Sequence, residues 1–360
     1  MKRVFITDCE GPISKNDNAF EIMSHFVPHG DKIFTVVSRY DDALSDVLRR
    51  PGHKAGETLK LVLPFLKAYD VTDREVRQFS ARNLLLVAHA RESLRHVGSI
   101  SAAYIVSTSY EHYIRALCQT LEFPFANTYC TKLSLDEYSI TEEEKSQLKR
   151  IGMEIAQLRV FEIPPEAKSP KDLSEEAKMT IRRLDEIFWK TIARMRVGKI
   201  YSQVNPMGGR EKAEAIKEIT GKDNVTIVDA MYVGDSITDE EAFKLVKENG
   251  GLTVSFNGNQ HAVMNAEIAL LSSDSLTTAV IADVFIKFGK TETLNLVAKW
   301  SRGALKNRLV NEDLLDHFLK LHPRELPKAE IITRENKESL ARESNEFRKK
   351  VRGESIGRLG

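Results

Sequence analysis

Two carboxylates stand where a short apolar run of the sequence ends. The run Val4–Thr7 suits a buried strand, and Asp8 and Glu10 follow it directly, before Gly11-Pro12. A carboxylate at a strand end can cap a helix, bind a cation or attack an electrophile. Capping alone does not favour two acids two positions apart, whereas a bend after them lets both face one pocket. We therefore predict that Asp8 and Glu10 do chemistry on a small substrate.

A second pair of acids follows a later apolar run. Asp235 ends the run, and Asp239 lies where Thr238-x-x-Glu241 predicts a capping box at the start of a helix. By itself this pair has the simpler interpretation of ordinary loop and cap acids. Beside the first pair, however, it would crowd negative charge without a cation, and oxygen ligands of this kind suit Mg²⁺. The predicted magnesium ligands are Asp8, Glu10, Asp235 and Asp239.

Hydroxyl and lysine side chains supply partners for a phosphoryl group. Ser107 and Thr108 follow an apolar run and precede a predicted helix, where hydroxyls and free N–H groups suit phosphate oxygens. Lys212 lies in the first turn of the helix after Gly208-Gly209, and its ammonium would offset phosphoryl charge. Taken singly, Ser107 has the simpler interpretation of a helix cap, and Lys212 that of a surface lysine.

The apolar runs before these residues indicate the fold class. They are apolar at consecutive positions, which is typical of strands buried on both faces of a parallel sheet. They cover residues 4–7, 103–106, 225–233 and 250–256. Helical stretches separate them, so we predict an α/β fold with a doubly wound parallel sheet. Ligands of such sheets bind at the carboxyl ends of the strands, where the polar clusters fall.

The long segments between these strands predict helical insertions. Residues 14–98 are too many for a simple crossover, and their helical part opens at the capping box Thr72-x-x-Glu75 and closes at Gly98. Residues 140–199 form a second insertion, with helices starting at Thr141 and Ser174. The predicted core is 1–13, 99–139 and 200–289, with 14–98 as a helical cap and 290–360 as a charged helical C-terminal extension. From about residue 330 we expect a solvated helix or a disordered end.

The composition limits the classes of partner. The 360 residues include 53 basic and 52 acidic ones, a formal net charge of +1 that argues against nucleic acid as the main partner. No apolar stretch approaches the roughly 18 residues of a membrane helix. Cys9, Cys118 and Cys130 follow no disulfide or metal spacing, which fits a reducing compartment. We expect a cytoplasmic protein without direct membrane insertion.

The ordered series Asp8-x-Glu10, Ser107, Lys212 and Gly234-Asp235-x-x-x-Asp239 resembles the motifs of the haloacid dehalogenase (HAD) superfamily. The likeness spans roughly residues 4–272. It is most detailed with the phosphoserine phosphatase branch, through "FANTY" and "SFNGNQHAVMNAEIALLSSDS". The whole chain also resembles archaeal HAD-like proteins known as subunit R of energy-converting hydrogenase A.

The resemblance implies a HAD (Rossmann-like) core with helical caps and a role for each motif. Asp8 would attack phosphorus and form an aspartyl-phosphate, and Glu10 would protonate the leaving oxygen and then activate water. Ser107 and Lys212 would hold the transferring phosphoryl group of a small phosphorylated metabolite.

The resemblance also implies a magnesium site. Mg²⁺ would bind Asp8, the main-chain carbonyl of Glu10, and Asp235. Asp239 would orient Lys212 or a metal-bound water.

Two positions depart from the family pattern. Most family phosphatases have Asp where Glu10 stands, and phosphoserine phosphatases usually have Asn where Thr238 stands. The extra methylene of Glu10 adds about 1.5 Å of reach, and a displacement of that size can cost about 10²-fold in rate. Some relatives, including a homoserine phosphotransferase type, do carry Asp-x-Glu.

The leading prediction is therefore a Mg²⁺-dependent phosphomonoester phosphatase. One alternative is a phosphotransferase that passes the phosphoryl group to an alcohol. The other is a non-catalytic accessory subunit of an archaeal hydrogenase complex, which could bind a protein partner through the C-terminal extension. Substrate specificity stays open. Asp17 could bind an amine, and a substrate carboxylate could be reached by Arg39, Arg49, Arg50 or His53, although solvated surface roles are the simpler interpretation.

Overall fold

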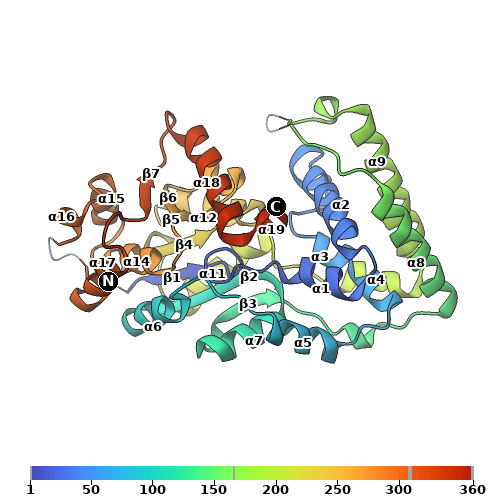
Figure 1. Ribbon diagram of the computed structural model, residues 1–360, viewed down its shortest axis with the longest axis horizontal. Coiled ribbons are helices and arrows are strands. Elements are labelled where there is room, and N and C mark those ends of the chain that lie inside the picture. Colours follow the sequence, from blue (N-terminus) through green and yellow to red (C-terminus); the bar gives the residue numbers. More distant parts are fainter. Residues whose placement is uncertain (1, 165–166, 307–309, 358–360) are drawn as a thin grey trace.

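A seven-stranded sheet forms the centre of the molecule, with strand order β3-β2-β1-β4-β5-β6-β7 (Figure 1). The computed structural model describes residues 2–164, 167–306 and 310–357, so the parts of the predicted segments at 1, 165–166, 307–309 and 358–360 lie outside the described residues. Strands β1 to β6 are parallel, and β7 joins the edge antiparallel. The predicted doubly wound α/β class is confirmed. The strands are β1 (Val4–Thr7), β2 (Ala102–Tyr110), β3 (Thr128–Thr131), β4 (Ala230–Gly234), β5 (Leu252–Phe256), β6 (Ile268–Leu271) and β7 (Lys328–Ile331).

Helices cover both faces of the sheet, as the consecutive apolar residues of its strands require. In β1, Phe5 packs with the cluster beneath α6, α7 and α14, whereas Val4 and Ile6 pack with the cluster beneath α11 and α12. Because strand side chains alternate between faces, one fully apolar strand serves both layers. These helices, with the adjacent α13, are α6 (Ala90–Ile100), α7 (Glu111–Leu121), α11 (Arg210–Lys222), α12 (Glu240–Glu248), α13 (Gln260–Asn265) and α14 (Leu276–Phe288).

The helices of the two predicted insertions pack into one helical cap beside the sheet (Figure 1). A single apolar cluster joins residues from 19–76 with residues from 133–204. The predicted capping boxes at Thr72 and Thr141 and the cap at Ser174 are confirmed, each with its side-chain oxygen accepting from the third backbone N–H of its helix. The cap helices are α1 (Asn18–Phe26), α2 (Gly30–Asp42), α3 (Thr58–Leu61), α4 (Leu63–Ala68), α5 (Asp73–Arg82), α8 (Glu142–Gln157), α9 (Glu175–Asp185) and α10 (Ile200–Gln203).

The helical stretch predicted from Thr72 to Gly98 is interrupted, and this expectation is corrected. Helix α5 ends at Arg82, and α6 runs from Ala90 past Gly98 to Ile100. The residues between them form backbone hydrogen bonds with the segment after β1. Lys15 N–H donates to Leu85 O (2.8 Å), and Val87 N–H donates to Ile13 O (2.8 Å). Tertiary pairing therefore overrides the local helical pattern.

The expectation of a solvated or disordered end from about residue 330 is wrong. Strand β7 extends the sheet, and α18 lies against α13 and β6 with Leu340, Ala341, Ser344 and Arg348 buried. Figure 1 shows α18 and α19 beside the space between core and cap. The remaining C-terminal helices are α15 (Lys290–Ala298), α16 (Arg302–Leu305), α17 (Glu312–Leu321), α18 (Lys337–Arg352) and α19 (Glu354–Gly357).

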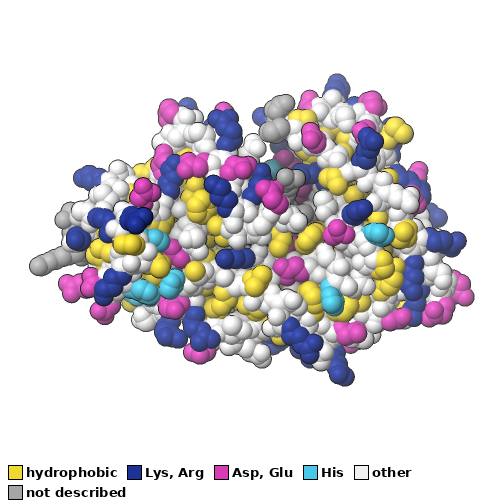
Figure 2. Space-filling view, in the orientation of Figure 1, with side chains coloured by type: hydrophobic (Ala, Val, Ile, Leu, Met, Phe, Trp, Pro, Cys, Tyr) yellow, Lys and Arg dark blue, Asp and Glu magenta, His cyan; other side chains and the backbone are white. Residues whose placement is uncertain are grey.

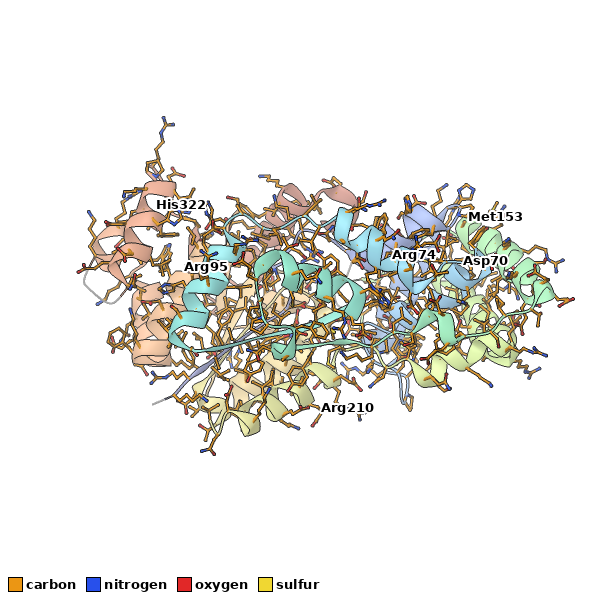
Figure 3. The ribbon with its side chains drawn as sticks, turned by 90° about the horizontal axis from the view of Figure 1, so that it is seen from below. Asp70, Arg74, Arg95, Met153, Arg210 and His322 are labelled. Carbon is orange, nitrogen blue, oxygen red and sulfur yellow. The ribbon has the colours of Figure 1, made fainter. Side chains whose placement is uncertain are left out.

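The cap and helices α15 to α17 lie at opposite ends of an elongated molecule (Figure 1). Figure 3 shows Asp70 and Met153 of the cap at one end and His322 at the other. Among the described residues, no helix combines the length and the apolar character needed to cross a membrane.

A buried ion cluster holds the cap loop that lies over the sheet edge. His53 Nε2 lies 2.7 Å from Asp41 Oδ1, and His53 Nδ1 lies 3.1 Å from Glu57 Oε2. Asp41 Oδ2 also accepts from the N–H groups of Gly56 and Thr58. Both ring nitrogens face carboxylates, so both donate only when the imidazole is protonated. Although burial lowers the pKa of His53, the two carboxylates override it and raise the pKa to about 9.

The stability of this loop should depend on pH. A pKa raised above the ordinary value of 6.5 contributes stability below about pH 6.5, which is lost as pH rises through about 9. His53→Gln should therefore lower the free energy of unfolding by roughly 3 kcal/mol more at pH 6 than at pH 9.5. Denaturant unfolding at both pH values measures this difference.

Thr58→Val is the matched control. It removes the hydrogen bond of 2.8 Å that an uncharged hydroxyl donates to the same Asp41 carboxylate, so its cost should stay constant across the window. An equal cost of His53→Gln at both pH values would show that the imidazole is not charged in the folded state.

Candidate active site

The predicted site residues gather at the carboxyl ends of three adjacent strands. β1 lies between β2 and β4, and Thr7 pairs with Ile105 on one side and with Val233 on the other. The chain fills the sheet on the β2 side first and then on the β4 side, so this is the topological switch point where open α/β sheets bind ligands. Asp8, Ser107 and Asp235 each lie one or two residues beyond these paired positions.

A buried lysine connects two of the predicted acids. Lys212 Nζ lies 2.9 Å from Asp8 Oδ2 and 2.7 Å from Asp239 Oδ1, and its side chain is 0% exposed. Gly209, at the start of α11, has φ +55° and donates its N–H to Thr238 O (3.0 Å), which sets the first turn of the helix against the loop after β4. Lys212 is therefore not the surface lysine that it would be when taken singly.

Asp239 is fully committed to protein partners. Its Oδ1 accepts from Lys212 and from the Tyr232 hydroxyl (2.6 Å), and its Oδ2 accepts from the N–H groups of Asp235 (2.9 Å) and Ser236 (3.0 Å). The capping box predicted at Thr238 is wrong, because Ser236 and Asp239 form the box instead. Asp239 thus orients Lys212 and the backbone beside Asp235.

Burial and charge set the protonation of this group. Burial raises the pKa of Asp8 to about 7, against the opposing effect of Lys212 and with further raising by Asp239 and Asp235. Burial also opposes ionisation of Asp239, but Lys212 holds the pKa of that carboxyl below its usual range. The pKa of Lys212 rises despite its burial, because two carboxylates contact it. The lysine is thus a permanent cation, while Asp8 depends on further positive charge to stay ionised.

Three carboxylates can share one cation here. Asp8, Asp235 and Asp239 each offer an oxygen within 4.8 Å of the others, and all three are buried. Asp239 already has its partners and does not line the cavity, whereas Asp8 and Asp235 do. One oxygen of Asp8 accepts the Cys9 N–H, and the other pairs with Lys212. Buried hard oxygen donors fit a divalent cation such as Mg²⁺.

Glu10 lies on the cap side of the site. Its Oε1 accepts the Asn18 N–H (2.7 Å) at the start of α1, where Asp17 is the N-cap and accepts from Phe20 N–H (3.0 Å). Burial, followed by the charge of Asp17, raises the pKa of Glu10 well above its usual range. A raised pKa favours the protonated form of this carboxyl group, and a protonated carboxyl can donate a proton.

The predicted phosphate-binding hydroxyls lie inside β2 and not in a loop before α7. The register of β2 with β3 shifts between Ser107 and Tyr110, as in a β-bulge. Thr108 lines a cavity of about 100 Å³ together with Asp8, Glu10 and Asp235. Ser107 is buried, and its Oγ accepts the Ser109 N–H (3.2 Å). It is not among the described residues that line this cavity.

Two arginines that the sequence did not single out also line the cavity. Arg348 and Arg352 of α18 both donate to Asp235 Oδ2, the latter at 3.0 Å. The sequence held one signal for them, because Leu340, Ser344, Arg348 and Arg352 recur every fourth residue and so share a helix face. Because three of these four residues are polar or charged, the recurrence does not resemble the apolar face of a buried helix.

Most of the proposed carboxylate-binding side chains have partners inside the protein. Arg50 forms two 2.7 Å bonds with the Asp185 carboxylate, and His53 belongs to the loop cluster. Arg39 and Arg49 line a separate cavity of about 500 Å³ between the cap and α18. Figure 2 shows this face hollowed between these two parts.

The turn after Asp8 should not tolerate a side chain. Gly11 has φ +109°, and a Cβ there would overlap the Asp235 carboxylate. We expect Gly11→Ala to lower the free energy of unfolding by roughly 1–3 kcal/mol more than Gly52→Ala. Gly52 also has a positive φ (+79°), but nothing lies within 4 Å of its would-be Cβ. Thermal unfolding compares the two variants, and equal losses would place the cost in the backbone alone.

Comparison with solved structures gives a similarity that extends over the whole chain. The structure of gene product AF1437 from Archaeoglobus fulgidus matches with a TM-score of 0.81 and 26% identity, covering 100% of this chain and 99% of that one. No protein-family model and no curated protein matches the sequence.

Phosphoserine phosphatase structures match more weakly. A substrate-bound complex has a TM-score of 0.44 and 12% identity, covering 76% of this chain and 95% of that one. An apo form has a TM-score of 0.43 and 13% identity, covering 81% and 100%.

Proposed function

We propose that this protein is a Mg²⁺-dependent phosphatase that hydrolyses a small phosphomonoester through Asp8. The observation that carries the proposal is the buried row Asp8–Lys212–Asp239 at the switch point of the sheet, beside a further carboxylate, Asp235. One carboxylate would be enough to neutralise the charge of a buried lysine. A lysine placed between two acids at a ligand-binding edge instead suits a site that must receive and neutralise transferred negative charge.

Asp8 is the nucleophile in this proposal. Its Oδ1 accepts the Cys9 N–H at 2.6 Å, and its Oδ2 pairs with Lys212, so the carboxylate is fixed in orientation. One carboxylate oxygen forms a bond to phosphorus as the P–O bond to the substrate's alcohol breaks. The product is an aspartyl-phosphate and a free alcohol.

Glu10 moves the proton in both half-reactions. Its raised pKa favours the protonated carboxyl group, and in this proposal that group donates a proton to the departing alkoxide. In the second half it takes a proton from the water that attacks the aspartyl-phosphate. That step releases inorganic phosphate and restores Asp8.

Two kinds of donor would serve the phosphoryl oxygens. Lys212 would supply a fixed positive charge beside Asp8, and Thr108, which lines the cavity, would supply a hydroxyl. The buried Ser107 lies one residue before Thr108 in β2. A bound Mg²⁺ would be held by Asp8, Asp235 and the main-chain carbonyl of Glu10, and it would neutralise charge on the phosphoryl oxygens. The cavity of about 100 Å³ favours a small substrate.

Phosphate release from a panel of small phosphomonoesters tests the proposal. We expect turnover with Mg²⁺ that stops with EDTA and falls by roughly 10³-fold or more in Asp8→Asn, since the amide is a poor nucleophile. Lys212 keeps Asp239 as a partner in that variant, so the fold should persist. Asp313→Asn, at an exposed position of α17, is the matched control and should keep full activity.

Three outcomes would contradict the proposal. Undiminished release by Asp8→Asn would remove Asp8 as nucleophile. An absence of release from every ester, with substrate consumed only when an alcohol acceptor is added, would make the protein a phosphotransferase. Inactivity under all conditions would favour the accessory-subunit alternative.

A further inference from the structure

The carboxylate of Asp235 has two internal counter-ions from the far end of the chain. Arg348 donates to Asp235 Oδ2 and, at 3.3 Å, to Asp235 O, while Arg352 donates to the same Oδ2 at 3.0 Å. The side chains of Arg348 and Arg352 are 3% and 5% exposed. Such buried guanidinium groups supply a strong local positive charge.

The same oxygen cannot serve a divalent cation at the same time. Both of its lone pairs already accept from guanidinium N–H groups. A directly bound Mg²⁺ would lie about 2.1 Å from a carboxylate oxygen. Two guanidinium groups in contact with that oxygen would then face a double positive charge at close range. The arginines and a cation therefore exclude one another at Asp235 Oδ2.

The first half of α18 and its last turn make different kinds of contact with the rest of the protein. Leu340 and Ala341 pack with Val263, Ala269 and Leu271, which anchors the first half of the helix on the sheet. Phe347 also packs against this cluster. The last turn beyond it forms polar contacts: Arg352 Nε donates to Lys15 O (3.1 Å), and another guanidinium nitrogen donates to Asn16 O.

The surroundings leave room for that turn to move. The cavity of about 500 Å³ beside Lys349 opens on the cap side of α18. Gly353, with φ +86°, follows the helix directly and offers a flexible joint before α19.

We propose that the end of α18 is a latch in which Arg348 and Arg352 compete with a divalent cation for Asp235. With the latch closed, the two arginines neutralise the carboxylates of the cavity and fill part of it. Cation binding displaces both guanidinium groups from Asp235 and loosens the last turns of α18. This inference rests on the cation site of the proposed function, but not on the phosphatase reaction.

Calorimetric titration with Mg²⁺ alone tests the competition. A competitor built into the protein lowers the apparent affinity by the fraction of molecules in which the latch is open. We expect Arg348→Gln combined with Arg352→Gln to tighten Mg²⁺ binding by roughly tenfold or more. Arg342→Gln, at an exposed position of the same helix, should leave the affinity unchanged. Equal or weaker binding by the double variant, or no binding by any variant, overturns the proposal.

Hydrogen exchange of the wild-type chain gives a second test that needs no substitution at a buried position. Mg²⁺ should speed exchange of the amides at 345–352 and leave those of β5 unchanged. Unchanged or slower exchange at 345–352 on saturation with Mg²⁺ overturns the latch. Tightened Mg²⁺ binding in the double variant, together with no phosphatase activity in any variant, would retain the latch and reject only the proposed function.

Discussion

The structure depends on holding several carboxylates together in a buried place. Asp8, Asp235 and Asp239 lie within reach of one cation. Glu10 and Asp17 line the cavity of about 100 Å³ together with Asp8 and Asp235. Buried like charges repel strongly, and removing them from water is costly. Such a cluster persists only if positive charge and hydrogen bonds reach it. Much of the remaining architecture can be understood as the means of bringing that charge in.

The positive charge comes from two distant parts of the chain. Lys212 enters from the first turn of α11, which packs against one face of the sheet, and it compensates Asp8 and Asp239. Arg348 and Arg352 enter from α18, more than a hundred residues later, and compensate Asp235. The C-terminal segment is therefore part of the electrostatic balance of the site. The match with the Archaeoglobus fulgidus structure covers 100% of this chain and 99% of that one, so it includes the C-terminal segment. The segment therefore belongs to the shared fold.

Short sequence patterns predicted the features that depend on neighbouring residues. The end of β1, the caps at Thr72, Thr141 and Ser174, and the gathering of Asp8 with Asp235 at one edge all follow from short patterns and from the geometry of parallel sheets. The break before α6 and the packing of α18 depend on pairing with remote segments. Leu85 meets Lys15, and Arg348 meets Asp235, across sequence distances that no local pattern records. Arg348 and Arg352 belong to a charged segment that predicts a solvated end, but they are buried because their counter-charge, Asp235, lies elsewhere in the chain.

Glu10 shows how one methylene can connect the site to the cap. Its carboxyl group accepts the Asn18 N–H, which is one of the unpaired donors at the start of α1. Asp17, the N-cap of the same helix, lies close enough to raise the pKa of Glu10 through its charge. The longer side chain thus reaches a helix terminus of the cap, and any shift of α1 changes both the hydrogen bond and the charge that set its protonation. The position of the cap and the readiness of Glu10 to give up a proton are therefore coupled through two adjacent residues.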